Sequence, residues 1–351
     1  MSTFKRFLQY YKPYKGIFFM DLFCALIMCI VDLSFPLILS YCTGQFFLKS
    51  SNEILKGVFV LGIGLLVMYV IRALCRYYVS CQGHVMGANM ESDMRQDLFN
   101  QYQRLSFSYY DKHNTGVMMS RVVSDLFDIC EFAHHGPENL FISLFKIVGS
   151  FIILATIYWP LALILLAVTV VMMVFSYSQN KKMRRTFMEN RKKIGSVNAS
   201  LQDSLGGIRV VQSFANEDIE IDKFNHSNME FLESKKDIYR VMGTFQGGNN
   251  FFQGLLYVTI IVFGGLFIAN GDLNPIVLAT FALYINVFVS PIEVLVEFTE
   301  MFQKGFSGFR RFEEVMNEVP EIQDSKNAKD LENVSGNIDY DHVSFQYNEN
   351  E

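Results

Sequence analysis

The stretch IFFMDLFCALIMCIVDLSFPLILSY (residues 17–41) decides the fold of this chain. Its only charged side chains are Asp21 and Asp32. An α-helix rises about 1.5 Å per residue, so about 20 apolar residues cross a hydrocarbon core that is roughly 30 Å thick. The stretch is too long for the hydrophobic part of a signal peptide, and no cleavage-site pattern follows it. It therefore predicts an uncleaved transmembrane helix.

Five more segments pass the same test, which makes six predicted spans: 17–41, 57–79, 138–158, 161–178, 251–269 and 276–299. The composition agrees, with 51% hydrophobic and 19% charged residues and a mean hydropathy of +0.21. A soluble chain of this length would need more polar surface. The net charge of −5 gives no reason to expect a nucleic-acid partner. We expect an all-α membrane protein.

The distribution of Lys and Arg predicts the orientation. Basic residues precede the first span and crowd residues 181–193, just after the fourth, whereas the connections 158–160 and 270–275 carry none. By the positive-inside rule both termini are cytoplasmic. The two inner connections, roughly 80–137 and 179–250, are long and have helical periodicity. The transmembrane helices are therefore expected to continue into the cytoplasm.

The two ends of the chain differ from the six-span region, which is assigned to residues 16–315. Residues 1–15 place Phe4, Phe7, Leu8 and Tyr11 on one helical face, which predicts an amphipathic helix on the inner leaflet, with a frayed basic terminus as the alternative. Residues 316–335 form a polar linker. Residues 336–351 alternate like β-strands and are expected to begin a soluble domain that the chain does not complete.

Three stretches carry a resemblance to a known family: LSFSYYDKHNTGVMMSRVVSD (105–125), GIRVVQSFANED (207–218) and IDYDHVSFQY (338–347). Together with six spans and long inner arms, they resemble the membrane-spanning half of a bacterial ATP-binding cassette (ABC) exporter, of the type I multidrug and lipid class. The resemblance covers the whole chain. It implies a multi-pass protein of the bacterial cell membrane that exports a hydrophobic, amphipathic or lipid-like substrate by alternating access.

The resemblance also implies partners and site residues. The partners are a second transmembrane half, in a homodimer or heterodimer, and nucleotide-binding domains that use ATP and Mg²⁺. In the family, the first two stretches form coupling loops against those domains, and an aromatic residue at the position of Tyr347 stacks on adenine. The implied coupling residues are Asn114, Thr115, Gly116, Val117, Met118, Arg121, Phe214, Ala215, Asn216 and Glu217. We expect Val117 and Met118 to face a groove, and Phe214 to anchor the second contact.

No phosphate-binding G-x-x-x-x-G-K-[ST] motif, Walker-B-like strand or signature loop occurs in the sequence, so no ATPase activity is expected of this chain alone. A non-transporting membrane protein, acting as a regulator or assembly partner, is therefore the alternative. The His and Cys content argues against a membrane-bound redox enzyme.

Polar residues within the spans are candidates for a substrate cavity, because intramembrane charges are costly. They are Asp32, Gln246, Asn249, Asn250, Glu293 and Glu297. The acidic members would favour cationic or amphipathic cargo. The alternatives are solvated carboxylates near the cytoplasmic mouth and, for residues 246–250, close helix packing. His84, His113, His134 and His135 are interpreted as solvated or capping side chains, and no metal site is predicted.

Overall fold

The computed structural model describes residues 3–325, 327–330 and 335–344. Within these residues the chain folds into helices and connecting segments. The long helices are α2 (Lys15–Gly44), α3 (Ser51–Tyr78), α4 (His84–Arg104), α7 (Leu126–Gly206), α9 (Glu217–Ala269) and α10 (Pro275–Met316). The short α-helices are α1 (Thr3–Phe7), α5 (Phe107–Lys112), α6 (Thr115–Ser120) and α8 (Ile208–Ser213). The 3₁₀ turns η1 (Leu8–Tyr11) and η2 (Phe46–Leu48) and the π-helical turns η3 (Val79–Gly83) and η4 (Arg121–Asp125) complete the described helices.

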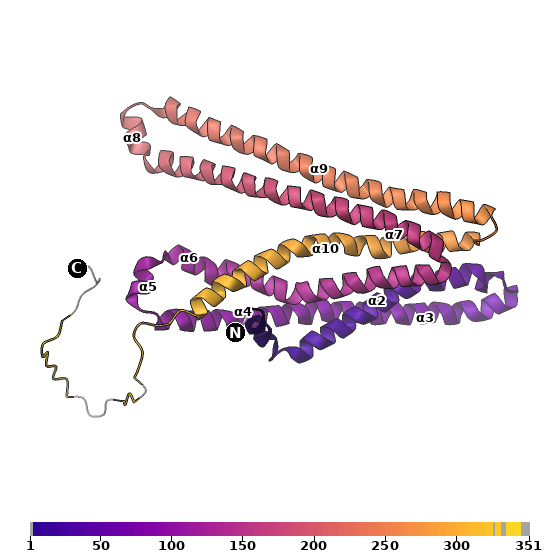
Figure 1. The fold of residues 1–351 in the computed structure, drawn as a ribbon, viewed down its shortest axis with the longest axis horizontal. Coiled ribbons are helices and arrows are strands. Elements are labelled where there is room, and N and C mark those ends of the chain that lie inside the picture. Colours follow the sequence, from indigo (N-terminus) through magenta and orange to yellow (C-terminus); the bar gives the residue numbers. More distant parts are fainter. Residues whose placement is uncertain (1–2, 326, 331–334, 345–351) are drawn as a thin grey trace.

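All six predicted spans lie in helices, although only five continuous helical segments among the described residues are long and apolar enough to cross a membrane. The difference arises in α7, which contains both the third and the fourth predicted span. Its backbone leaves the helical region at Tyr158 (φ −159°, ψ 95°), two residues before Pro160. Because proline lacks a backbone N–H, a helix is easily interrupted there. The two halves of α7, residues 126–157 and 160–206, run in different directions (Figure 1).

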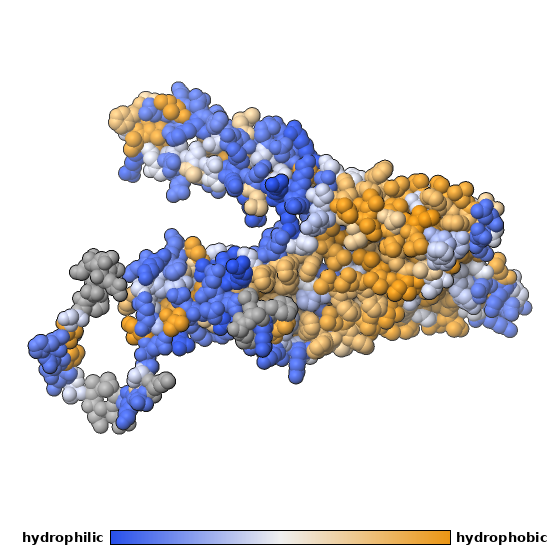
Figure 2. All heavy atoms as spheres, in the orientation of Figure 1, coloured by the Kyte–Doolittle hydropathy of each residue, from blue (hydrophilic) through white to orange (hydrophobic). Residues whose placement is uncertain are grey.

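The helices give the molecule two chemically different ends. In Figure 2 hydrophobic residues cover the half of the molecule that contains the six predicted spans, which we name the apolar end. Hydrophilic residues dominate the opposite half, the polar end, where α5, α6 and α8 lie in Figure 1. Bulky apolar side chains face outward from the apolar end, including Phe59 (73% exposed) and Val60 (71% exposed) on α3. Such a surface is stable against lipid rather than water.

The second half of α7 pairs with α9 in a long hairpin that has α8 at its tip and diverges from the other helices toward the polar end (Figures 1 and 2). Inside the hairpin, Ser176 Oγ donates to Asn249 Oδ1 at 2.6 Å. A Cβ atom on Gly248 would lie 2.1 Å from the Phe175 ring, so glycine permits the close approach of α9 to α7. The Arg184 guanidinium links the hairpin to Thr299 and Gln303 of α10.

The N-terminal prediction needs a correction. Residues 3–11 are helical, but the Phe7 and Tyr11 side chains are buried against protein rather than available to lipid. Phe7 packs on Phe132 and Phe309, and the Tyr11 hydroxyl donates to the Ala133 carbonyl at 2.6 Å. Burial raises the pKa of the Tyr11 phenol above its usual range. The N-terminal segment thus packs against α7 and α10.

The predicted C-terminal β-structure is not formed in the part that the structure describes. Residues 335–344 contain no strand, and α10 ends at Met316, at the start of the predicted linker. A strand needs a neighbour with which to form hydrogen bonds, and no described segment lies alongside these residues. Tyr347, the predicted adenine contact, lies outside the described residues.

Candidate functional site

A cavity of about 330 Å³ opens within the apolar end, between α2, α3, α7 and α10. The in-helix prolines Pro36 and Pro291 both contribute to its wall. A proline interrupts the helical hydrogen-bond ladder and bends the helix, which opens space between neighbouring helices. The other lining residues are Asp32, Phe35, Tyr69, Lys146, Leu283, Asn286, Val287 and Ser290.

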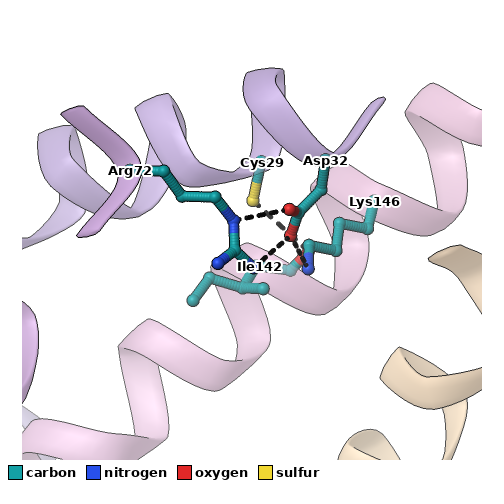
Figure 3. Close-up of polar contacts among 5 residues, drawn as sticks. All are labelled: Cys29, Asp32, Arg72, Ile142 and Lys146. Carbon is teal, nitrogen blue, oxygen red and sulfur yellow. Dashed lines mark hydrogen bonds and ion pairs between the residues drawn. The ribbon is translucent and has the colours of Figure 1, made fainter. Parts of the chain in front are cut away.

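Three charged side chains from three helices meet at this cavity (Figure 3). Arg72 of α3 donates from Nε to Asp32 Oδ1 at 2.7 Å, and Lys146 of α7 donates from Nζ to Asp32 Oδ2 at 2.6 Å. A second contact, from Arg72 Nη2 to Asp32 Oδ2, is longer at 3.4 Å. Because two cations share one carboxylate, the triad carries a net positive charge. Asp32 lines this cavity, but its charge is neutralised, which removes the argument from Asp32 for cationic cargo.

The predicted cavity residues on α10 lie outside the walls of this cavity. Glu293 and Glu297 are exposed and make no ion pair with any described residue. They share a helical face with the lining residue Ser290, because their spacing is three and then four residues. At about 1.5 Å per residue they lie about 4.5 Å and about 10 Å beyond Ser290 along α10, toward the polar end. Their carboxylates thus continue one face of the cavity away from its positive triad.

In the predicted polar run on α9, residues 246–250, some side chains pack against α7 and others are exposed. Asn249 is buried in the contact with Ser176, so its side chain holds α9 to α7 and does not face the cavity. Gln246 and Asn250 are exposed. From α9, the Gln253 side chain reaches the cavity wall, since its Nε2 donates to the lining residue Asn286 at 3.2 Å.

At the polar end, the first predicted coupling stretch forms α5, α6 and η4. Asn114 caps α6, because its side-chain Oδ1 accepts from the Gly116 amide at 2.7 Å, the usual role of asparagine at a helix start. Thr115 begins the helix, and Val117 is 53% exposed. Met118 is buried in the hydrophobic core with Tyr102 and Tyr109, so the expectation that it faces a groove is wrong. Met118 is the one residue of α6 that points into the core, whereas its neighbours Val117 and Met119 are exposed.

Two ion pairs fix this stretch to the end of α10. Asp125 accepts from Nε and Nη2 of Arg311 at 2.6 Å and 2.7 Å. This bidentate geometry makes a strong arginine–carboxylate contact. Arg121 approaches Glu314 at 3.8 Å. A groove of about 570 Å³ lies beside these pairs, and Asn114, Gly116 and Val117 form its other side.

The second predicted coupling stretch forms α8 and the turn that follows it. Phe214 is 72% exposed in this turn, and Ala215 adopts a left-handed backbone (φ 49°) that reverses the chain. Asn216 precedes α9, and Glu217 lies in its first turn, where a negative charge is favourable. The two predicted coupling stretches thus expose apolar side chains at the same end of the molecule (Figure 1).

A family model for the ABC transporter transmembrane region matches residues 18–292, which contain both predicted coupling stretches and all the residues that line the cavity. This chain belongs to that family. The ABC transporter ATP-binding protein YwjA of Bacillus subtilis, described as uncharacterized, is 37% identical over 98% of this chain and 60% of its own length.

Two further relatives of this ABC transporter chain have names that mention cargo. An ATP-dependent lipid A-core flippase of Syntrophus aciditrophicus is 24% identical over 99% of this chain and 58% of its own length. The putative multidrug export ATP-binding/permease protein YgaD of Bacillus subtilis is 25% identical over 99% of this chain and 60% of its own length. The chain thus spans about 60% of the length of these curated relatives. It is the transmembrane region of an ABC transporter.

The sequence analysis missed the contact of Arg72 with Asp32 in this ABC transporter chain. The signal was available, because Arg72 is a charged residue inside the second predicted span and would be costly in lipid without a partner. Pairing it with Asp32 required knowledge of how α2 and α3 face each other. Lys146 could likewise be recognised from the sequence as a charge inside the third predicted span, but its contact with Asp32 could not.

Proposed function

We propose that this chain is the permease half of an ATP-driven exporter whose substrate is amphipathic and carries an anionic headgroup. The observation that carries the proposal is the net positive triad of Asp32, Arg72 and Lys146 in a cavity at the apolar end. Inside a membrane protein a positive site attracts an anionic group strongly, because the surrounding dielectric constant is low. The apolar walls suit the hydrophobic part of such a molecule. The lipid flippase among the relatives supports an amphipathic cargo.

The polar end would be the cytoplasmic side and would receive nucleotide-binding domains. The basic residues that follow the fourth span support this orientation. Val117 and Phe214 are exposed apolar side chains at this end and are suited to contact a partner. ATP and Mg²⁺ would bind to the nucleotide-binding domains, with Tyr347 stacking on adenine. A second half, identical or different, would complete the pathway, and alternating access would move the substrate.

The test uses the full-length protein in lipid vesicles with ATP and Mg²⁺. Two fluorescent amphiphiles are compared, a labelled phosphatidylglycerol, which is anionic, and a cationic amphipathic dye. We expect ATP-dependent movement of the anionic lipid to exceed that of the dye. Lys146→Met removes one of the two cations and should lower movement of the anionic lipid at least about tenfold, which corresponds to about 1.4 kcal/mol.

The matched control is Lys236→Met, because Lys236 lies on the exposed surface of α9, away from the cavity. It should leave movement of both amphiphiles unchanged. Faster movement of the cationic dye, unaffected by Lys146→Met, would overturn the headgroup assignment. Absence of ATP-dependent movement of any amphiphile would instead favour the regulator or assembly partner.

A further inference from the structure

Three histidines that are far apart in the sequence meet near the boundary between the polar and apolar ends. His84 is the first residue of α4, directly after the π-helical turn η3, and His134 and His135 lie in the first half of α7. One ring nitrogen from each histidine lies within 4.8 Å of the corresponding atoms of the other two. The ring centroids of His134 and His135 are 4.1 Å apart, and that of His84 is 4.7 Å and 4.9 Å from them. His113 lies elsewhere, stacked on Tyr109.

The buried member of the cluster has the hydrogen bonding of a metal ligand. His134 is only 6% exposed, and its Nδ1 lies 2.7 Å from the Cys130 carbonyl oxygen. Because a carbonyl oxygen can only accept, Nδ1 carries the proton and Nε2 has a free lone pair. That Nε2 is buried and has no hydrogen-bond partner among the described residues. An unsatisfied buried acceptor costs about 1–3 kcal/mol, and a metal ion is the partner that this tautomer fits.

Carboxylates surround the same nitrogens. Glu131 places Oε1 at 4.0 Å from His134 Nε2 and Oε2 at 4.0 Å from His135 Nε2. Glu138 Oε2 lies 3.8 Å from His135 Nδ1. These separations are too long for hydrogen bonds. Two ligands of one tetrahedral zinc ion lie about 3.4 Å apart, given bonds of about 2.1 Å, so movements of about 1 Å would close the site.

The charge around the cluster favours a cation. Glu138 and Glu131 both lie within 4.0 Å of a His135 ring nitrogen, and both favour a positive charge at that position. Arg76 of α3 is the opposing charge. A Cβ atom on Gly87 of α4 would lie 2.7 Å from His134 Nδ1, so the absence of a side chain there lets α4 approach the cluster.

We propose that His84, His134 and His135, together with the Glu131 carboxylate, bind one divalent transition-metal ion of the zinc type between α4 and α7. Imidazole nitrogens with one carboxylate suit Zn²⁺ and its neighbours, whereas Mg²⁺ and Ca²⁺ prefer oxygen ligands. The bound ion would join α4 to α7 where both helices leave the apolar end. This proposal does not depend on the transported substrate.

The test is isothermal titration calorimetry, in which ZnCl₂ is added to the full-length, chelator-treated protein in the presence of excess Mg²⁺. Co²⁺ replaces Zn²⁺ in a parallel experiment, because its visible absorption reports tetrahedral coordination by nitrogen and oxygen. We expect saturable binding that includes one site per chain assigned to this cluster. His84→Ala should weaken binding to that site at least about tenfold and remove the corresponding Co²⁺ absorption.

Two features make the result interpretable. His84 is exposed, so His84→Ala should leave the melting temperature of the metal-free protein unchanged, whereas replacement of the buried His134 could prevent folding. Zn²⁺ should raise the melting temperature of the wild-type protein and raise it less in His84→Ala, as mass action requires. His226→Ala is the matched control, because His226 is an exposed histidine on α9 that approaches Glu230 alone among the described carboxylates. Equal Zn²⁺ affinity in the wild type and His84→Ala, or equal loss in His226→Ala, would overturn the proposal.

Discussion

Replacement of Asp32 by Asn should destabilise the transmembrane fold by about 2–4 kcal/mol. The substitution preserves size but removes the carboxylate that neutralises Arg72 and Lys146 in the triad. The two cations differ in exposure: the Lys146 side chain is 20% exposed, and the Arg72 side chain is 37% exposed. A hydrogen bond to a charged group contributes about 1.5–3 kcal/mol, and an exposed ion pair about 0–1 kcal/mol. Most of the loss should therefore come from Lys146.

A double-mutant cycle separates the pair from the general effect of each substitution. Lys146→Met should cost less than Asp32→Asn, because Asp32 keeps Arg72 as a partner. The coupling energy between Asp32 and Lys146 should be about 1–2 kcal/mol, since partners available to the unfolded chain in the membrane reduce such energies. The measurement is the free energy of unfolding in lipid–detergent micelles with increasing SDS.

Glu233→Gln provides the matched control for the cycle. Glu233 and Lys236 form an ion pair of the same length, 2.6 Å, but their side chains are 56% and 48% exposed. Its removal should cost at most about 0.5 kcal/mol. Equal losses for Asp32→Asn and Glu233→Gln, or strictly additive effects of Asp32→Asn and Lys146→Met, would refute the reasoning that the triad is a coupled, partly buried unit.

Three further predictions concern other parts of the chain. Met118→Ala should lower the free energy of unfolding by about 2–5 kcal/mol, because it removes a buried side chain. Val117→Asp should leave the free energy of unfolding nearly unchanged, because Val117 is exposed, and it should lower substrate-stimulated ATPase activity in the full-length protein. An equal loss of stability in the two variants would contradict the difference in burial. Gly248→Ala should destabilise the contact of α7 with α9 by about 1–3 kcal/mol in SDS unfolding, since its Cβ would meet the Phe175 ring. Gly247→Ala, with open space around the new Cβ, should be neutral or stabilising, and equal effects of the two substitutions would contradict the packing. In single-cysteine variants, maleimide at neutral pH should label Cys81 well before Cys130, because burial keeps Cys130 inaccessible and raises the pKa of its thiol to about 12. Mass spectrometry measures the extent of labelling with time. Equal labelling rates would contradict the dependence of thiol reactivity on exposure and pKa.

The sequence predicted the helices well because the signal for a transmembrane helix is local. Residues 17–41 and 276–299 each contain enough consecutive apolar residues to be recognised without knowledge of the fold, and they lie within α2 and α10. The turn at 158–160 was also recognised, because a proline and a break in the apolar run coincide there. The structure bends the chain at the same place.

The contacts between helices could not be predicted in the same way. His84 is far along the chain from His134 and His135, and their meeting depends on how α4 lies on α7. Phe7 and Tyr11 gave a correct helical face, but an apolar face fits lipid and protein equally well, and only the fold showed which one it contacts. The alternation in residues 336–344 likewise describes a strand only when a partner strand is present.

The hairpin of α7 and α9 has a geometric consequence for any force applied to its tip. At about 1.5 Å per residue, α9 is about 80 Å long, and only the part near the apolar end is packed among the other helices (Figure 1). It is therefore a lever with a short embedded arm and a long free one. A tilt of about 5° at the embedded end displaces α8 by about 7 Å. Conversely, a large displacement of α8 becomes a small rotation of α9 at the point where Gln253 donates to Asn286 of the cavity wall.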